Sequence, residues 1–407
     1  MRKGSSLFRL LLVVTLAAVL FMPAEAATVS SRYSKSKSQN ITESAKTKKK
    51  LSQSRHSRPV AKSATKSKKR KRRVSRKRHY YERFTGNSFA DNQTENDIIA
   101  GEDPIVRQAA IDALGNMNGT VVAVDPNSGR ILAMVNQDLA LSEGATPCST
   151  IKLSVALAAL NEGVITRDTK INVGRGYKMD LTTALAHSNN AFFEVLGRRM
   201  GFETVANYSH EFGLGELAGW NIPGEHLGIY PTEELDAKLG GVGKMCSFGE
   251  SINMTPLQLA ALVSAIANGG TLYYLQHPTT PEAVAAFKPR IKRQLDIAAS
   301  IPQMLDGMSG AVHYGTARSV RYSFNEEEIL GKTGTCSKDG VRFGWFASYA
   351  NTQYGKIAVV MFLKGGRPTF GPKAAELSGK LYRELYNRNF FAVQPANDKL
   401  TTVGASQ

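Results

Sequence analysis

The feature that most constrains the fold of this chain is a mainly helical stretch, about residues 150–325, that separates two groups of strand-like segments. Before this stretch, residues 120–124 and 130–135 are rich in Val, Ile, Leu and Ala. Between them stands the sequence Asp-Pro-Asn-Ser-Gly. Two such runs about a Pro, Asn and Gly turn are typical of a β-hairpin.

After the helical stretch the pattern returns to strands, at residues 329–335, 344–349 and 357–362. The last two are separated by a segment short enough for an antiparallel hairpin. Strands at both ends of the domain, with a large helical insert between them, predict an α/β (α+β) fold. We expect an antiparallel five-stranded sheet flanked by helices.

Several helices can be placed from apolar periodicity and end signals. Residues 105–114, 181–201 and 373–386 have apolar side chains at helical spacing. Thr255 suits a helix N-cap, and Gln258 completes a capping box three residues later. The helix that follows is apolar on nearly every side, which predicts burial between other helices.

The N-terminus predicts export. A basic start precedes an almost wholly apolar run at residues 7–22, and Ala24-Glu25-Ala26 offers small residues at signal-peptidase spacing. This pattern is typical of a signal peptide over residues 1–26. The alternative is a retained anchor, since about 16 apolar residues fall just short of a comfortable membrane span. In either case we expect the rest of the chain in the periplasm or at the outer face of the cytoplasmic membrane.

The positive charge is concentrated in one segment. The formal net charge is +18, yet residues 31–80 carry +19 and residues 1–30 carry +2, which leaves −3 for residues 81–407. A near-neutral domain gives no electrostatic support for nucleic-acid binding, so we expect none. The basic segment predicts a disordered polycation. It is either a solvated tether or a segment attracted to an anionic membrane or cell-wall polymer.

These patterns predict a chain of successive parts. They are the signal peptide (1–26), a basic disordered tail (27–80), a linker (81–102), a domain (103–390) and a polar C-terminal tail (391–407). The linker leaves no room for a glycosyltransferase module or a sizeable pedestal domain, so we expect neither between the tail and the domain.

Ser149 and Lys152 stand three residues apart at a predicted helix start. Pro147 precedes them, and the largely apolar run 153–160 follows. The spacing puts a hydroxyl and an amine on one face of the first turn, as a nucleophile beside a possible base. A Ser-x-x-Lys pair is common by chance, and the polar tail contains others. The pair therefore needs partners elsewhere in the chain.

Two further motifs follow in chain order. Ser188-Asn189-Asn190 lies in the helical stretch, and Lys332-Thr333-Gly334-Thr335 lies on the first returning strand. Each is weak alone, but together with Ser149-x-x-Lys152 they form a known catalytic set. On these motifs the chain resembles the transpeptidase domain of a penicillin-binding protein, within the serine β-lactamase-like superfamily. The resemblance covers about residues 103–390.

The resemblance implies acyl transfer on peptidoglycan stem peptides that end in D-Ala-D-Ala, and covalent capture by β-lactam antibiotics. Ser149 would attack the carbonyl. Lys152 would take its proton if burial and a neighbouring cation, Lys332, keep the amine partly neutral. Ser188 would relay a proton between the lysines and the leaving group, and Asn190 would hold Lys152 and the substrate amide. We assign this chemistry no cofactor and no metal.

The same resemblance implies that substrate lies along the returning strand. Lys332, Thr333 and Thr335 would bind the substrate, with Lys332 and Thr335 at its terminal carboxylate. Gly334, which has no side chain, would leave room for the peptide. The backbone N–H groups of Ser149 and Thr335 would form the oxyanion hole.

The cysteines lead to one structural prediction. Cys148 precedes the nucleophile and Cys336 follows Thr335, so the implied oxyanion hole would bring the two together. Because an exported compartment is oxidising, we predict a Cys148–Cys336 disulfide; the alternative is two small buried thiols. The placement resembles a bridge in some carbapenem-hydrolysing class A β-lactamases. Cys246 is left unpaired, and we expect it to be buried.

Several functions stay open beside the D,D-transpeptidase. A serine β-lactamase is the nearest, but the Glu-x-x-Leu-Asn stretch that class A members use for deacylation is missing between Ser188 and Lys332. That favours a long-lived acyl-enzyme. A D,D-carboxypeptidase shares the motifs. A non-catalytic β-lactam-binding receptor or wall-associated scaffold belongs to a different class.

Overall fold

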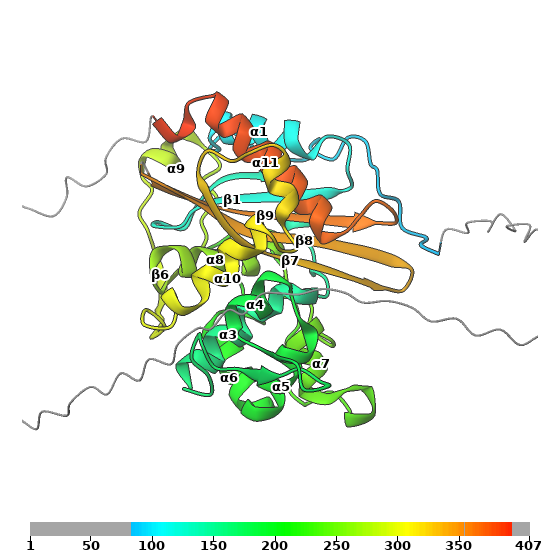
Figure 1. The fold of residues 1–407 in the computed structure, drawn as a ribbon. Helices are drawn as coiled ribbons and strands as arrows, with labels where there is room; N and C mark the ends of the chain where they lie inside the picture. Colours follow the sequence, from blue (N-terminus) through cyan, green and yellow to red (C-terminus); the bar gives the residue numbers. More distant parts are fainter. Residues whose placement is uncertain (1–82, 354, 393–407) are drawn as a thin grey trace, which may run out of the picture. The chain divides into compact units, whose positions relative to one another are not determined.

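The sheet is assembled from the two ends of the domain (Figure 1). β1 (Gly119–Asp125) and β2 (Arg130–Val135) form the first hairpin, and β7 (Glu328–Lys338), β8 (Val341–Thr352) and β9 (Gly355–Gly365) follow the helical stretch. All neighbouring strands are antiparallel, in the order β2-β1-β9-β8-β7. The predicted α/β fold with an antiparallel five-stranded sheet is therefore confirmed.

This computed structural model describes residues 83–353 and 355–392. The predicted signal peptide (1–26) and basic tail (27–80) lie outside the described residues, as does most of the C-terminal tail (391–407). Within the described ranges, no helix combines the length and the apolar character needed to cross a bilayer.

Helices cover both faces of the sheet. α1 (Pro104–Leu114) and α11 (Gly371–Asn387) pack on one face, and α8 (Pro256–Asn268) packs on the other (Figure 1). On β1, Val121 packs in the core on the side of α1 and α11, and Val122 packs in the core on the side of α8, because successive strand side chains point to opposite faces. Burial on both sides explains why the strands are continuous apolar runs. α8 begins with the predicted capping box and is buried along almost its whole length.

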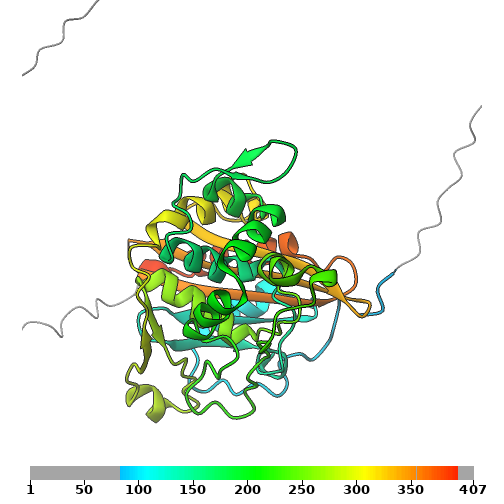
Figure 2. The same cartoon turned by 90° about the horizontal axis from the view of Figure 1, so that it is seen from below.

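The helical stretch forms a further layer, which lies in front of the sheet in Figure 2. Its longer helices are α3 (Lys152–Asn161), α4 (Leu181–Ala186), α5 (Asn190–Met200), α6 (Phe202–Glu211), α7 (Gly241–Phe248) and α10 (Pro302–His313). Short elements are α2 (Gln137–Ala140), η1 (Cys148–Ile151), η2 (Ala237–Leu239), α9 (Pro281–Ala285), η3 (Arg318–Tyr322) and η4 (Phe390–Ala392). Two small hairpins interrupt the helices, β3 (Ile171–Asn172) with β4 (Lys178–Met179), and β5 (Thr271–Tyr273) with β6 (Ile291–Gln294).

The helix predicted over residues 181–201 is broken in the middle, at the Ser-x-Asn motif. Ser188 has a left-handed backbone with φ of 55°. Asn189 then caps α5, because its side chain accepts from the N–H of Phe192 at 2.9 Å. Apolar periodicity continues across the break, so the sequence pattern did not reveal it. The break turns the Ser188 backbone and side chain toward the partners described below.

The segment predicted as a linker, residues 81–102, instead packs on the domain from its first described residues. Arg107 of α1 forms ion pairs of 2.8 Å with both Asp97 and Glu102, whose side chains are 2% and 1% exposed. Glu102 also accepts from the backbone N–H of Met134 at 2.9 Å. Burying three charges is tolerated only because each is paired and hydrogen-bonded. The polar composition of the segment hid this packing.

Candidate active site

Ser149 lies on η1, a tight turn that leads directly into α3. Cys148, at the start of the turn, has φ of 53°, and Lys152 is the first residue of α3. The Nζ of Lys152 lies 2.9 Å from the Oγ of Ser149. The predicted helix start therefore brings the hydroxyl and the amine into direct contact.

Lys152 is fully buried among oxygen atoms. Its Nζ donates to Asn190 Oδ1 at 2.6 Å and to the Ser188 carbonyl at 2.9 Å, and it lies 3.2 Å from Ser188 Oγ. Burial lowers the pKa of Lys152 to about 7, although the nearby carboxylate of Glu194 opposes the shift. At neutral pH, a substantial fraction of this amine is therefore uncharged.

Lys332 approaches the same hydroxyl from β7. It is also fully buried, and its Nζ donates to Ser188 Oγ at 2.8 Å and to the Thr333 carbonyl at 2.9 Å. Burial, and secondarily the charge of Lys152, hold the pKa of Lys332 well below its usual value. The charge of Lys332 was expected to lower the pKa of Lys152. In the structure, burial lowers the pKa of Lys152, and the coupling between the two charges acts on Lys332.

Gly334 allows β7 to lie against η1. A Cβ at this residue would come within 2.8 Å of the Pro147 carbonyl oxygen and 3.1 Å of Thr150 Cγ2. The missing side chain was expected to make room for a substrate peptide, but the structure uses that space for the turn that carries Ser149. The next residue, Thr335, accepts from the N–H of Gly371 through its hydroxyl at 2.8 Å. This hydrogen bond ties Thr335 to the start of α11.

A disulfide joins η1, which carries Ser149, to β7, which carries Lys332 and Thr335. Cys148 and Cys336 are bonded, with Cα atoms 5.5 Å apart, across a sequence separation of 188 residues. They flank Ser149 and Thr335, the residues whose N–H groups were expected to form the oxyanion hole. Cys246 is free and buried, and burial raises the pKa of its thiol to about 12. The structure thus agrees with the predicted pairing.

Removing the bridge should destabilise the domain and loosen the site. The variant Cys148→Ala/Cys336→Ala is expected to lose about 2–5 kcal/mol of unfolding free energy, because the bridge closes a long loop in the unfolded chain. We also expect slower acylation by a penicillin. Thermal unfolding and acylation rates measure the two effects, with Cys246→Ala as the control. A non-reduced digest should contain the Cys148–Cys336 cross-link; free thiols at both positions would contradict the structure.

Two contacts at the site were not predicted from the sequence. The hydroxyl of Thr316 lies 2.6 Å from that of Thr333, so it borders the predicted carboxylate site. The indole N–H of Trp345 donates to the Thr146 carbonyl at 3.0 Å, which secures the chain just before the catalytic turn. Neither residue belongs to the three catalytic motifs, and both contacts join segments that are far apart in the chain.

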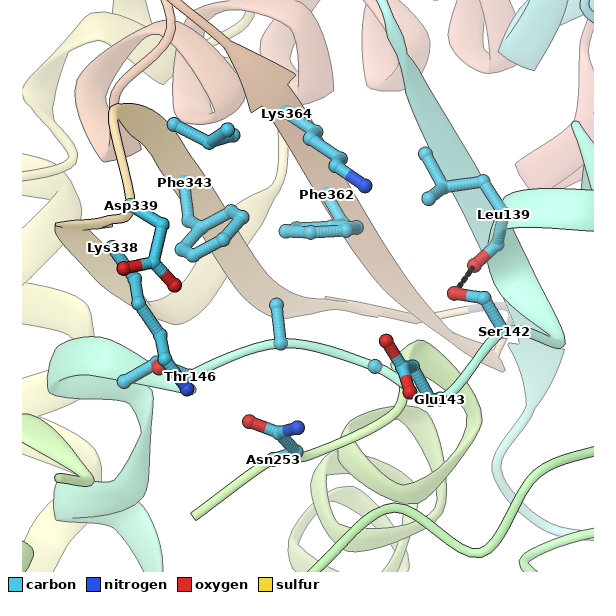
Figure 3. Close-up of a pocket in the computed structure, with 13 residues that line it drawn as sticks. Leu139, Ser142, Glu143, Thr146, Asn253, Lys338, Asp339, Phe343, Phe362 and Lys364 are labelled. Carbon is cyan, nitrogen blue, oxygen red and sulfur yellow. Dashed lines mark hydrogen bonds between the residues drawn. The ribbon is translucent and has the colours of Figure 1, made fainter. Parts of the chain in front are cut away.

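Two cavities lie beside the site. One, of about 330 Å³, adjoins Thr335 and Cys336. A second, of about 310 Å³, shares Thr146 and Lys338 with the first and has the rings of Phe343 and Phe362 side by side within it (Figure 3). The second contains no residue of the three motifs. Over residues 83–353 and 355–392, no cluster of three or more His, Cys, Asp or Glu side chains is arranged to hold a metal ion.

Comparison with known families gives a match over most of the domain. Residues 119–387 match the family described as the penicillin binding protein transpeptidase domain. The matched region contains all three motifs and every strand of the main sheet.

Curated relatives match at low identity. Stage V sporulation protein D of Bacillus subtilis is 30% identical over 261 residues, which are 53% of this chain and 39% of the relative. The peptidoglycan D,D-transpeptidase MrdA of Acinetobacter baumannii is 24% identical, over 75% of this chain and 56% of the relative. The peptidoglycan D,D-transpeptidase FtsI of Escherichia coli K12 is 25% identical, over 55% of this chain and 42% of the relative. The chain thus spans about two fifths to just over half of the length of these relatives.

Solved structures show the same fold. The D,D-transpeptidase domain of a peptidoglycan glycosyltransferase from Eggerthella lenta superposes with a TM-score of 0.56 and 21% identity, covering 71% of this chain and 82% of that one. Pseudomonas aeruginosa PBP2 in complex with WCK 5153 superposes with a TM-score of 0.59 and 23% identity. The match covers 72% of this chain and 75% of that one.

Proposed function

The chain belongs to the penicillin-binding protein transpeptidase family, and on this premise we propose that it is a peptidoglycan D,D-transpeptidase. It would act on stem peptides ending in D-Ala-D-Ala through a serine acyl-enzyme. One observation carries the proposal: a buried, partly neutral Lys152 amine lies 2.9 Å from the hydroxyl of Ser149. This is the arrangement that an activated serine nucleophile requires.

The hydrogen bonds around Lys152 support its role as the base. A neutral amine has two hydrogens and one lone pair. The Ser188 carbonyl and Asn190 Oδ1 can only accept, so they take the two hydrogens. The lone pair is then left for the hydroxyl of Ser149. Asn190 would in this way orient the base as well as hold it.

Acylation follows from these contacts. Ser149 Oγ forms a bond to the carbonyl carbon of the penultimate D-Ala, and the bond to the terminal D-Ala nitrogen breaks. The serine proton passes to Lys152 and then through Ser188, which lies between both lysines, to the leaving amine. Backbone N–H groups of Ser149 and Thr335 would stabilise the oxyanion, each worth about 3–4 kcal/mol. In the second half-reaction, the acceptor amine attacks the carbonyl carbon of the ester, the bond to Ser149 Oγ breaks, and a proton passes from the acceptor amine to Ser149.

The leaving D-Ala carries a carboxylate, and we place it beside Lys332, Thr333 and Thr335. A carboxylate there would stabilise the charged form of Lys332. A charged Lys332 would in turn repel a proton on Lys152. Substrate binding would therefore favour the neutral base at the moment when it is needed.

We further propose that the protein is exported and that its basic segment, residues 27–80, attaches it to an anionic membrane or cell-wall polymer. The Cys148–Cys336 bridge supports an oxidising compartment, in which disulfides persist. The pattern of residues 1–26 supports a signal peptide or an anchor.

A fluorescent penicillin tests the proposed function. The purified protein should form a stoichiometric adduct that persists for many minutes, and it should release D-Ala from a D-Ala-D-Ala peptide only when an acceptor amine is present. Rapid loss of the label with antibiotic hydrolysis would indicate a β-lactamase instead. D-Ala release to water alone would indicate a carboxypeptidase, and a stable adduct without any peptide turnover would indicate a receptor.

A further inference from the structure

A pocket of about 330 Å³ continues from the catalytic strand and is not used by the mechanism above. It lies between the end of β7, the end of α7 and the loop before the nucleophile. Its lining residues are Thr146, Lys244, Phe248, Glu250, Thr335, Cys336, Ser337 and Lys338. Thr335 belongs to the proposed oxyanion hole, so the pocket opens directly beside the reacting carbonyl.

The pocket is lined by charges of both signs. Lys244 is half-buried on α7 with its Nζ 4.0 Å from the centre of the Phe248 ring, while Lys338 and Glu250 are exposed. None of the three forms an ion pair with another residue of the described ranges. Two ammonium groups and one carboxylate are therefore available to a ligand.

The direction of β7 indicates which part of the donor peptide reaches this pocket. The proposed carboxylate site uses the side chains of Lys332, Thr333 and Thr335, and the reacting carbonyl is held by the backbone N–H of Thr335, at the C-terminal end of this set. Continuing in the same direction, the acyl part of the donor runs past Ser337 toward Lys338. Three strand residues span about 10 Å. The residue before the two D-alanines begins about 3.8 Å further along the donor, and a long side chain from it can enter the pocket.

We propose that this pocket binds the far end of that third-residue side chain and selects one that ends in both an amino group and a carboxylate. A diamino dicarboxylic acid has such an end, whereas lysine ends in an amine alone. Lys244 and Lys338 would hold the carboxylate, and Glu250 would hold the ammonium. An ammonium group alone, as in lysine, would be repelled by Lys244 and Lys338 and attracted only by Glu250. This inference rests on the proposed function, because it uses the direction of the D-Ala-D-Ala donor.

The test is equilibrium binding to the full chain carrying Ser149→Ala, which cannot consume the donor. Two stem pentapeptides are compared that differ only in the third residue, meso-diaminopimelate or L-lysine. We expect the diaminopimelate peptide to bind about tenfold more tightly at low salt, with the ratio falling as salt rises. Lys244→Gln/Lys338→Gln in the same background should bring the ratio close to one by weakening only the diaminopimelate peptide. Glu250→Gln should weaken that peptide as well.

Equal affinities for the two peptides would overturn the proposal. So would a ratio that the paired lysine variant leaves unchanged, or a loss of affinity that is the same for both peptides, since that would indicate a merely structural role. Ser142→Ala, on the loop outside this pocket, is the matched control. Acylation of the wild-type chain by benzylpenicillin tests the proposed function separately, because that compound has no group for the pocket.

Discussion

Ser149→Ala should form no covalent adduct with any penicillin and should lose peptide turnover by a factor on the order of 10⁴–10⁶. The acyl-enzyme is an ester on one atom, the Oγ that lies 2.9 Å from Lys152 Nζ. The other close hydroxyl, Ser188 Oγ, lies 3.2 Å from Lys152 Nζ and also accepts from Lys332 Nζ at 2.8 Å, so both of its lone pairs face lysine donors. Intact-protein mass spectrometry after incubation with benzylpenicillin measures the adduct directly.

The control for this prediction is Ser142→Ala, which removes a hydroxyl from the same segment of chain but away from the lysines. Its Oγ donates to the Leu139 carbonyl at 2.8 Å. We expect a full adduct from this variant and the same thermal unfolding from both. A penicillin adduct on the Ser149→Ala protein, mapped to another residue, would refute the assignment of the nucleophile.

The acylation rate should rise with pH through about 7 and then level off. The proton acceptor is the neutral form of Lys152, and its pKa of about 7 means that the neutral fraction is about one tenth at pH 6 and about nine tenths at pH 8. The active, neutral form is gained as pH rises and lost as pH falls. Because burial lowers the pKa of Lys152, this change takes place near pH 7. Below pH 6 the rate should fall about tenfold for each pH unit. Stopped-flow acylation with a chromogenic cephalosporin gives this profile.

Lys152→Met tests the same group by removing it with little change in volume. Loss of the base should slow acylation by about 10²–10⁴-fold and should remove the rise of the rate near pH 7. The control is Lys364→Met, since Lys364 is an exposed lysine on β9. If the Lys152→Met protein kept the same pH profile at a reduced rate, another group would have to be the base, and Lys332 would be the next candidate.

The three motifs could be recognised from sequence because each is a short local pattern. Ser149 and Lys152 share one turn, and Lys332 to Thr335 occupy one strand, so spacing alone placed each set. The break at Ser188 could not be seen in this way. It depends on a left-handed residue and on contacts to Lys152, which lies on another helix. The packing of residues 84–102 was missed for the same reason, since Arg107 neutralises charges that look solvent-exposed in the sequence.

What the sequence by itself determined is the set of elements and the chemistry they carry: apolar runs and turns for the sheet, end signals for α8, and nucleophile, base and carboxylate-binding residue types. Only the tertiary structure decided how these groups behave. The pKa of Lys152 depends on burial by segments far away in the chain, and Ser188 reaches both lysines because the turn between α4 and α5 meets Lys152 of α3 and Lys332 of β7. The pocket of Lys244, Glu250 and Lys338 likewise joins α7 to β7. Local interactions select helices and strands, whereas desolvation and charge coupling exist only between groups that folding has brought together.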